Sequence, residues 1–140
     1  MASENWFSKL EATIFTMVKF RLEKTLKKKF PNLFCTTSSQ TDADPVFPTV
    51  YIHELPGIEA GSDLENDAVN AVLETLQVEV TTNTGKVDCQ TVIAETIKQF
   101  KFLRFDIVAF PVFSIEGNVH RGIFRARRLI GASDTDIVKI

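Results

Sequence analysis

In the N-terminal quarter of the chain, apolar residues recur at the spacing of one face of an α-helix. Pro31 ends the predicted helix, because proline disfavours helical backbone in the residue before it. A helix over residues 3–29, at about 1.5 Å per residue, is roughly 40 Å long and crosses a compact domain of this size. Its apolar stripe, spaced by three and four residues, comprises Phe7, Leu10, Ile14, Met17, Val18, Leu22 and Leu26.

Alternating apolar and polar residues farther along the chain predict a set of strands. Residues 58–67 connect two of these strands over too many residues for a tight turn, which predicts a projecting hairpin arm. Residues 87–102 return to a helical period, and residues 111–118 are predicted to form a loop. The predicted strands cover residues 32–35, 47–55, 68–82, 105–110 and 119–130.

These elements predict an α+β fold. Strands joined by short loops are antiparallel, and two amphipathic helices must cover one face of the sheet that those strands form. The expected architecture is one antiparallel or mixed sheet of four to five strands with both helices on one face and a projecting arm. The chain of 140 residues is expected to form one domain over residues 1–130, with residues 131–140 as a C-terminal extension.

Charge is distributed unevenly along the chain. The formal net charge is −2, yet residues 1–30 carry +4, residues 31–97 carry −10 and residues 98–130 carry +5. One interpretation is a set of solvated faces of opposite sign. The other is a molecule whose surfaces are complementary to one another, as head-to-tail self-assembly requires.

The sequence contains no motif of an active site or a metal site. His53 and His120 lie 67 residues apart, and metal ligands of the right type and spacing are missing. Cys35 and Cys89 are expected to be reduced and structural, with a disulfide between them as the alternative. The longest apolar run, residues 107–113, is far shorter than a membrane span. We therefore expect no enzyme activity, no cofactor, no metal and no membrane association.

The basic strand and the C-terminus each admit two interpretations. Arg121, Arg125 and Arg127 alternate on one strand face, which fits a solvated or subunit-interface surface and also, less well, contacts to nucleic-acid phosphates. Arg128 falls on the apolar face and is expected beyond the edge of the core. The apolar C-terminal residues 137–140 either fray or add a strand to a neighbouring subunit.

The order of several segments resembles a known family. The N-terminal helix ends in KFPN at residues 29–32 and is followed by FPTVYI at residues 47–52, DLEN at residues 63–66 and LQVEV at residues 76–80. A second helix, RFDIVA at residues 104–109 and FRARRLIG at residues 124–131 complete the set. In order and spacing, over about residues 10–133, the chain resembles the small tail terminator, or tail completion, proteins of long-tailed bacteriophages.

The resemblance implies a structural virion protein that is assembled in the host cytoplasm and located in the tail or neck. Such proteins form a ring, usually a hexamer, that caps the head-proximal end of the tail tube and stops its polymerisation. The implied partners are further copies of the chain, the tail tube protein and the head-completion or neck protein, with DNA only as cargo passing through the ring. An alternative is another head–tail connector or neck ring protein; a small nucleic-acid-binding module is a further one.

A ring requires that one surface of a subunit contact a different surface of the next subunit. DNA slides through a ring only if the channel is not strongly basic, since many phosphate contacts would hold it. The arginines are therefore expected at an interface rather than along the channel. The residues predicted at a subunit or tube interface are Glu59, Asp63, Leu64, Glu65, Asp67, Arg121, Arg125, Arg127, Ile137, Val138 and Ile140.

Overall fold

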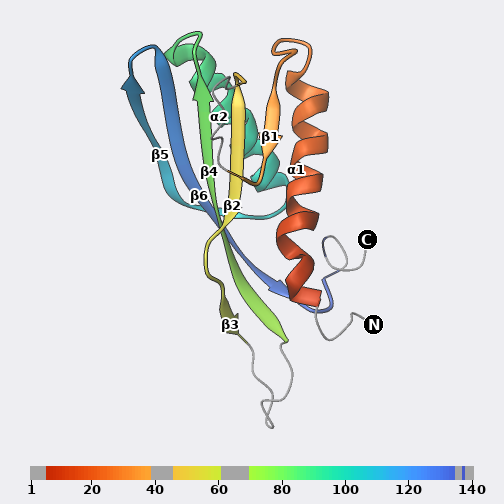
Figure 1. Cartoon of the computed structure of the whole chain (residues 1–140). Coiled ribbons are helices and arrows are strands. Elements are labelled where there is room, and N and C mark those ends of the chain that lie inside the picture. The colour runs from red at the N-terminus through yellow and green to blue at the C-terminus, as the bar shows by residue number, and fades with distance from the viewer. Residues whose placement is uncertain (1–5, 39–45, 61–69, 135–136, 138–140) are drawn as a thin grey trace.

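The computed structural model describes residues 6–38, 46–60, 70–134 and 137. The fold is α+β, as predicted, with two α-helices and a mixed sheet of six strands rather than four to five. Figure 1 shows the arrangement. The elements are η1 (Trp6–Lys9), α1 (Leu10–Leu26), β1 (Phe34–Thr36), β2 (Thr49–Glu54), β3 (Ile58–Ala60), β4 (Ala71–Thr82), α2 (Lys86–Phe102), β5 (Asp106–Glu116) and β6 (Val119–Gly131).

The sheet is built around the long antiparallel pair of β4 and β6. Its strand order is β1-β2-β4-β6-β5, and β3 pairs with the first residues of β4 off this path. The pairing of β4 with β6 runs without a register shift from Ala71 opposite Gly131 to Thr82 opposite His120. β1 is parallel to β2, and the remaining pairs are antiparallel. This uninterrupted pair fixes which side chains share a face across the centre of the sheet.

One face of the sheet is buried against the two helices. Along β4 the even-numbered residues from Glu74 to Thr82 are buried, and the odd-numbered residues are only partly buried. Helix α1 buries every fourth residue, which is the spacing of one helical face. From α2, Phe100 packs edge-on against Phe105 and Phe124. The buried residues of α1 are Leu10, Ile14, Val18, Leu22 and Leu26.

Arg21 joins the two helices. Its Nε donates a hydrogen bond to Oε1 of Gln99, a buried residue of α2. The guanidinium lies 3.6 Å from the centroid of the Phe102 ring, the distance of a cation–π contact. These contacts hold α1 beside α2, so that the helices form one layer.

The first predicted helix is longer than the observed one. A 3₁₀ turn, η1, precedes α1, and α1 ends at Leu26 with a turn over residues 27–29. Residues 3–5 of the predicted helix lie outside the described residues. The backbone N–H of Lys29 and that of Phe30 both bond to the Leu26 carbonyl, which closes the helix before Pro31.

The predicted loop at residues 111–118 is wrong. β5 continues through Pro111 to Glu116, and Gly117 and Asn118 alone form the turn into β6. Proline is tolerated here because β5 is the last strand of the sheet order, so that none of the described strands lies on its outer side and requires the missing N–H. Register shifts between Ile107 and Val112 absorb the irregularity.

Gly122 is required where β6 passes beneath α2. A Cβ at this position would lie 2.1 Å from Cδ1 of Ile93 and 3.1 Å from Cε1 of Phe113. We predict that Gly122→Ala lowers the free energy of unfolding by about 1–3 kcal/mol through overpacking. Ile93→Val removes the clashing methyl group at a cost of about 0.5–1.5 kcal/mol. The double variant, measured by urea denaturation, should lose less than the sum of the single variants; strict additivity would contradict this packing.

Candidate functional site: an uncovered sheet edge and an acidic pocket

The helix layer is narrower than the sheet. Two helices side by side cover roughly 20 Å, which is about four strands at about 4.8 Å each. The main sheet path has five strands, and β5 lies at its outer edge (Figure 1). Among the hydrophobic side chains of β5, only Ile107 and Phe113 pack partly against the core. Other apolar side chains of this strand lie at the surface on both faces. Val112, opposite Ile123, points to the face without helices, and Ile115, opposite His120, points to the helix-covered face but remains exposed.

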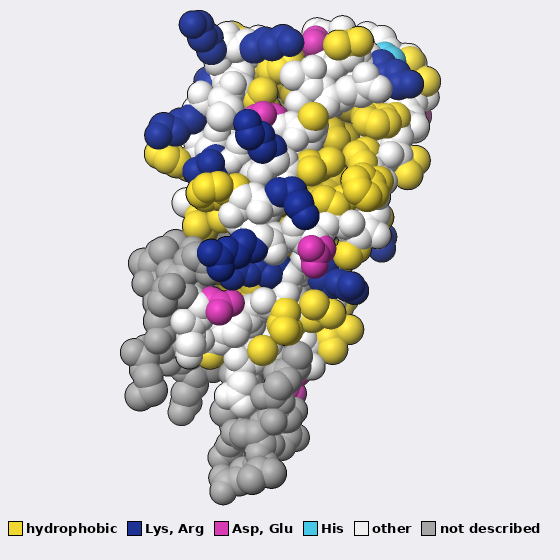
Figure 2. Space-filling model, turned by 180° about the vertical axis from the view of Figure 1, so that it is seen from behind, with side chains coloured by type: hydrophobic (Ala, Val, Ile, Leu, Met, Phe, Trp, Pro, Cys, Tyr) yellow, Lys and Arg dark blue, Asp and Glu magenta, His cyan; other side chains and the backbone are white. Residues whose placement is uncertain are grey.

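These side chains make β5 an exposed apolar edge. Phe110 is 73% exposed, Val112 71% and Ile115 61%, and Val108 is also exposed. Figure 2 shows hydrophobic side chains gathered along the side of the molecule where β5 lies. A long exposed apolar edge strand is a template for pairing with another chain.

The second half of β5 is the part best suited to such pairing. The bulges between Ile107 and Val112, together with Pro111, interrupt the first half. From Val112 opposite Ile123 to Glu116 opposite Val119 the register is regular. Residues 112–116 therefore offer a regular outer edge to which a neighbouring strand could bond.

Three arginines of β6, called the arginine row below, lie on the sheet face that points away from the helices. The register confirms that Arg121, Arg125 and Arg127 share one face of β6, and all three are exposed. Arg121 Nε lies 2.9 Å from Glu79 Oε1, and Arg125 Nε donates to Gln77 Oε1 at 2.9 Å. Two of the three arginines are thus tied to β4. Arg127 has no ion pair or hydrogen bond in the part of the chain that the structure describes.

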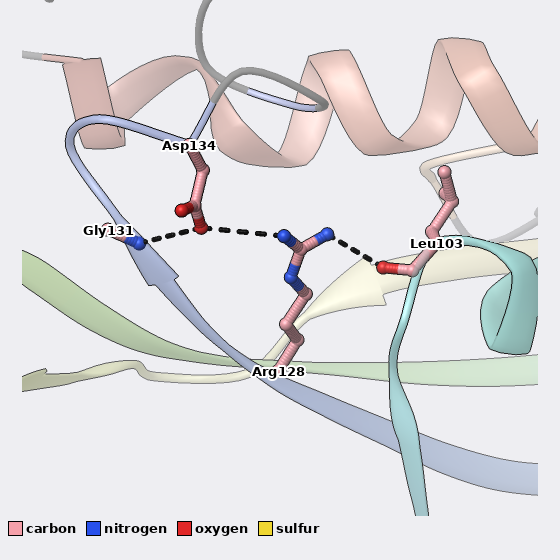
Figure 3. Close-up of polar contacts among 4 residues, drawn as sticks. All are labelled: Leu103, Arg128, Gly131 and Asp134. Atoms are coloured by element: carbon pink, nitrogen blue, oxygen red, sulfur yellow. Dashed lines mark hydrogen bonds and ion pairs between the residues drawn. The ribbon is translucent and has the colours of Figure 1, made fainter.

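Arg128 was expected beyond the edge of the core, and this prediction is wrong because its side chain is largely buried. Its side chain is only 9% exposed. The guanidinium donates to the Leu103 carbonyl at 2.7 Å and lies 3.4 Å from Asp134 Oδ2, which also accepts the Gly131 N–H (Figure 3). Hydrogen bonding satisfies this buried charge. Arg128 therefore joins the C-terminal end of α2 to the turn after β6.

The predicted acidic arm is described only at its base. Glu59 lies in β3, exposed and opposite Val72 of β4, so residues 58–60 do begin a hairpin with β4. Asp63, Leu64, Glu65 and Asp67 lie outside the described residues. From this part of the chain, the structure therefore places only Glu59 among the predicted interface residues.

The apolar C-terminus is described at one position only. Ile137 is 2% exposed and belongs to the chain's own core. This packing leaves little of its side chain for a neighbour, and its role at an interface stays a prediction. Val138 and Ile140 lie outside the described residues.

An acidic pocket was not predicted. It has a volume of about 270 Å³ and lies where η1 and the start of α1 meet the β3 end of the sheet. Figure 1 shows η1 and β3 at the same end of the molecule. Glu11 lies next to it, since its Oε2 accepts the Glu54 N–H at 2.8 Å. The lining residues are Phe7, Leu10, Glu54, Gly57, Glu59, Val72 and Glu74.

Glu74 is the unusual residue of this pocket. It is 1% exposed, and its Oε2 has no hydrogen-bond partner among the described residues. Burial raises the pKa of its carboxyl to about 9, with a side-chain hydrogen bond to Glu54 and the charges of Glu54 and Glu11 adding to the effect. Glu74 is therefore neutral at neutral pH. The alternation of buried residues along β4 already places it on the core face, which is the signal that could have revealed it.

The two cysteines lie inside the fold. Cys35 and Cys89 are free and buried. Burial raises the pKa of the Cys35 thiol to about 11 and that of Cys89 above its usual value, which makes both poor nucleophiles. Within the described ranges, no three His, Cys, Asp or Glu side chains are arranged to hold a metal ion. No helix in these ranges is long and apolar enough to cross a membrane.

The role of Arg128 is testable against its neighbour. Arg128→Met leaves the Leu103 carbonyl and Asp134 without this donor, and should lower the free energy of unfolding by about 1–3 kcal/mol. Arg127→Met, one residue away on the exposed face, should change it by less than about 0.5 kcal/mol in dilute solution. Urea denaturation measures both variants, and equal losses would contradict the structural role of Arg128.

Glu74 makes the stability depend on pH. Between pH 4.5 and about 9 the folded chain keeps a proton on Glu74 that the unfolded chain has lost. The stabilisation by this group is therefore complete below pH 4.5 and falls as the pH rises toward 9. Glu74→Gln keeps the group neutral, so its stability relative to the wild type should increase from pH 5 to pH 8, by up to about 1.4 kcal/mol per pH unit. Thermal unfolding at several pH values measures this difference; parallel curves would contradict the raised pKa.

Comparisons with known proteins do not assign the chain to a family. No family model matches the sequence, and no curated protein matches it either.

Proposed function

We propose that this chain is a structural protein that assembles into a closed ring, with the role of a phage tail terminator. The proposal rests on the exposed apolar edge of β5, where residues 112–116 pair with no strand on their outer side among the described residues and can pair with another chain. The ordered resemblance of residues 10–133 to tail terminator proteins supplies the biological role. Such a ring would cap the tail tube, stop its polymerisation and present a surface to the neck.

The charge arrangement supports contacts between unlike surfaces. The acidic pocket lies at the β3 end of the molecule, and the arginine row runs along the open face of β6. These are two different surfaces of opposite sign, as contact between successive subunits of a ring requires. Complementary charges also suppress incorrect pairing and set the register of the contact.

A second candidate function follows from the open sheet face. Tyr51 and His53 stack with ring centroids 4.6 Å apart, and His53 lies in the same cross-strand row as Gln77 and Arg125. Aromatic rings beside arginines on an open sheet are features of nucleic-acid-binding sheets. This function requires binding to DNA or RNA that weakens steeply with salt, and a chain that binds without assembling would favour it.

The edge is tested by a matched pair of variants. Val112 in β5 and Val87 in α2 are both 71% exposed. Val112→Lys places a charge on the edge and should keep the chain at the monomer mass of 15.7 kDa, because edge lysines block strand pairing. Val87→Lys should assemble like the wild type. Light scattering over a range of protein concentrations measures the masses; a Val112→Lys chain that still assembles would contradict the proposal.

The arginine row is tested by charge reversal. Arg125→Glu with Arg127→Glu should abolish assembly, because it puts acids where the neighbour is expected to be acidic. Lys98→Glu with Lys101→Glu makes the same change in net charge on exposed positions of α2 and should leave assembly intact. Intact rings of the arginine double variant in electron micrographs would contradict the interface role of the row.

A further inference from the structure

The acidic pocket has the composition of a site for an organic cation. Glu54, Glu59 and Glu74 contribute carboxyl groups, while Phe7, Leu10 and Val72 contribute apolar walls. An aromatic ring beside carboxylates favours a cation that carries some apolar surface. A metal ion fits less well, because the described residues contain no metal-binding group of three suitable side chains.

Glu74 gives this pocket an unmet hydrogen-bonding requirement. Its buried Oε2 has no hydrogen-bond partner among the described residues, although Glu74 lines the pocket. Buried polar atoms are usually paired. Arg128, the residue opposite Glu74 on β6, directs its guanidinium to Leu103 and Asp134. A cationic donor entering the pocket would supply the partner that Oε2 lacks.

We propose that this pocket binds the guanidinium of an arginine from a second copy of this chain; the inference rests on the ring-forming function proposed above. At about 270 Å³ the pocket is smaller than the roughly 300–1,000 Å³ of sites for drug-sized ligands, and its size suits a single side chain. Guanidinium suits it better than ammonium because its planar fork can bond two carboxylates and its face can stack on Phe7.

Among the three arginines of the row, Arg127 is best placed to be the guest, that is, the arginine that enters the pocket of a second copy. Arg121 and Arg125 are already held by Glu79 and Gln77. Arg127 is exposed and has no ion pair or hydrogen bond within the described ranges. It can therefore reach a neighbour without breaking a contact in its own subunit.

The pocket can be tested without assembly. The dilute monomer is titrated with ethylguanidinium chloride and, separately, with ethylurea, its uncharged isostere, at constant ionic strength. Amide NMR signals of η1, β3 and the start of β4 should shift saturably with ethylguanidinium and not with ethylurea. Glu74→Gln should weaken this binding about tenfold at pH 8.5, while Glu116→Gln, which removes an exposed carboxyl at the β5–β6 turn, should not.

The pH dependence separates binding at Glu74 from a general attraction to acids. Glu74 faces Glu11 of α1, Glu54 of β2 and Glu59 of β3, with Arg128 of β6 opposite it. A bound cation displaces the Glu74 proton, so the wild-type affinity should rise between pH 7 and 9, by at most about tenfold per pH unit for one proton. Glu74→Gln should show a flat profile. Equal responses to the two probes, or an unchanged profile in Glu74→Gln, would overturn the site.

A second measurement tests the source of the guest. Arg127→Ala should weaken self-association about tenfold, Arg127→Lys should recover part of the loss, and neither should change ethylguanidinium binding by the monomer. If Arg127→Ala assembles like the wild type, Arg127 of a second copy is not the guest. If the wild-type chain never assembles, the proposed ring fails, and the ethylguanidinium titration still decides whether the pocket binds a cation.

Discussion

The sheet has helices on one face and ends at β5, and these two facts determine which surfaces the molecule offers. The continuous pairing of β4 with β6 sets a broad sheet, and two helices joined through Arg21 cover about four strands of it. β5 lies at the edge of this sheet, with Phe110, Val112 and Ile115 at the surface. A monomer that exposes such a strand risks uncontrolled association. A closed ring would use the same strand and leave it with no free edge.

The same geometry leaves the opposite end of the helix layer open. Where η1 and the start of α1 meet β2, β3 and β4, three carboxyl groups line one pocket. Glu74 remains neutral there because burial and its acidic neighbours disfavour its ionised form. A basic group that enters the pocket from another molecule would favour the ionised form of Glu74 instead. The pocket and the arginine row are thus unlike surfaces that could meet only between two molecules.

The periodicity of apolar residues predicted which helices and strands form, but it predicted their first and last residues less well. The face shared by Arg121, Arg125 and Arg127 followed from alternation, because the register of β6 has no shift against β4. Pro111 misled the prediction for β5, since a proline is tolerated in a strand whose outer edge is unpaired. Alternation also places Arg128 and Glu74 on the core face. The contacts of Arg128 depend on Leu103 and Asp134, and the raised pKa of Glu74 depends on burial and on Glu54. Only the tertiary fold brings these groups together.

In the proposed ring, residues 112–116 of β5 pair with another copy of the chain. Hydrogen–deuterium exchange of this segment, at protein concentrations below and above the onset of assembly, measures this pairing. These amides should exchange more slowly in the assembled chain, while exposed residues of α2 such as Val87 and Lys98 keep their exchange rates. Assembly with unchanged exchange in residues 112–116 would contradict it.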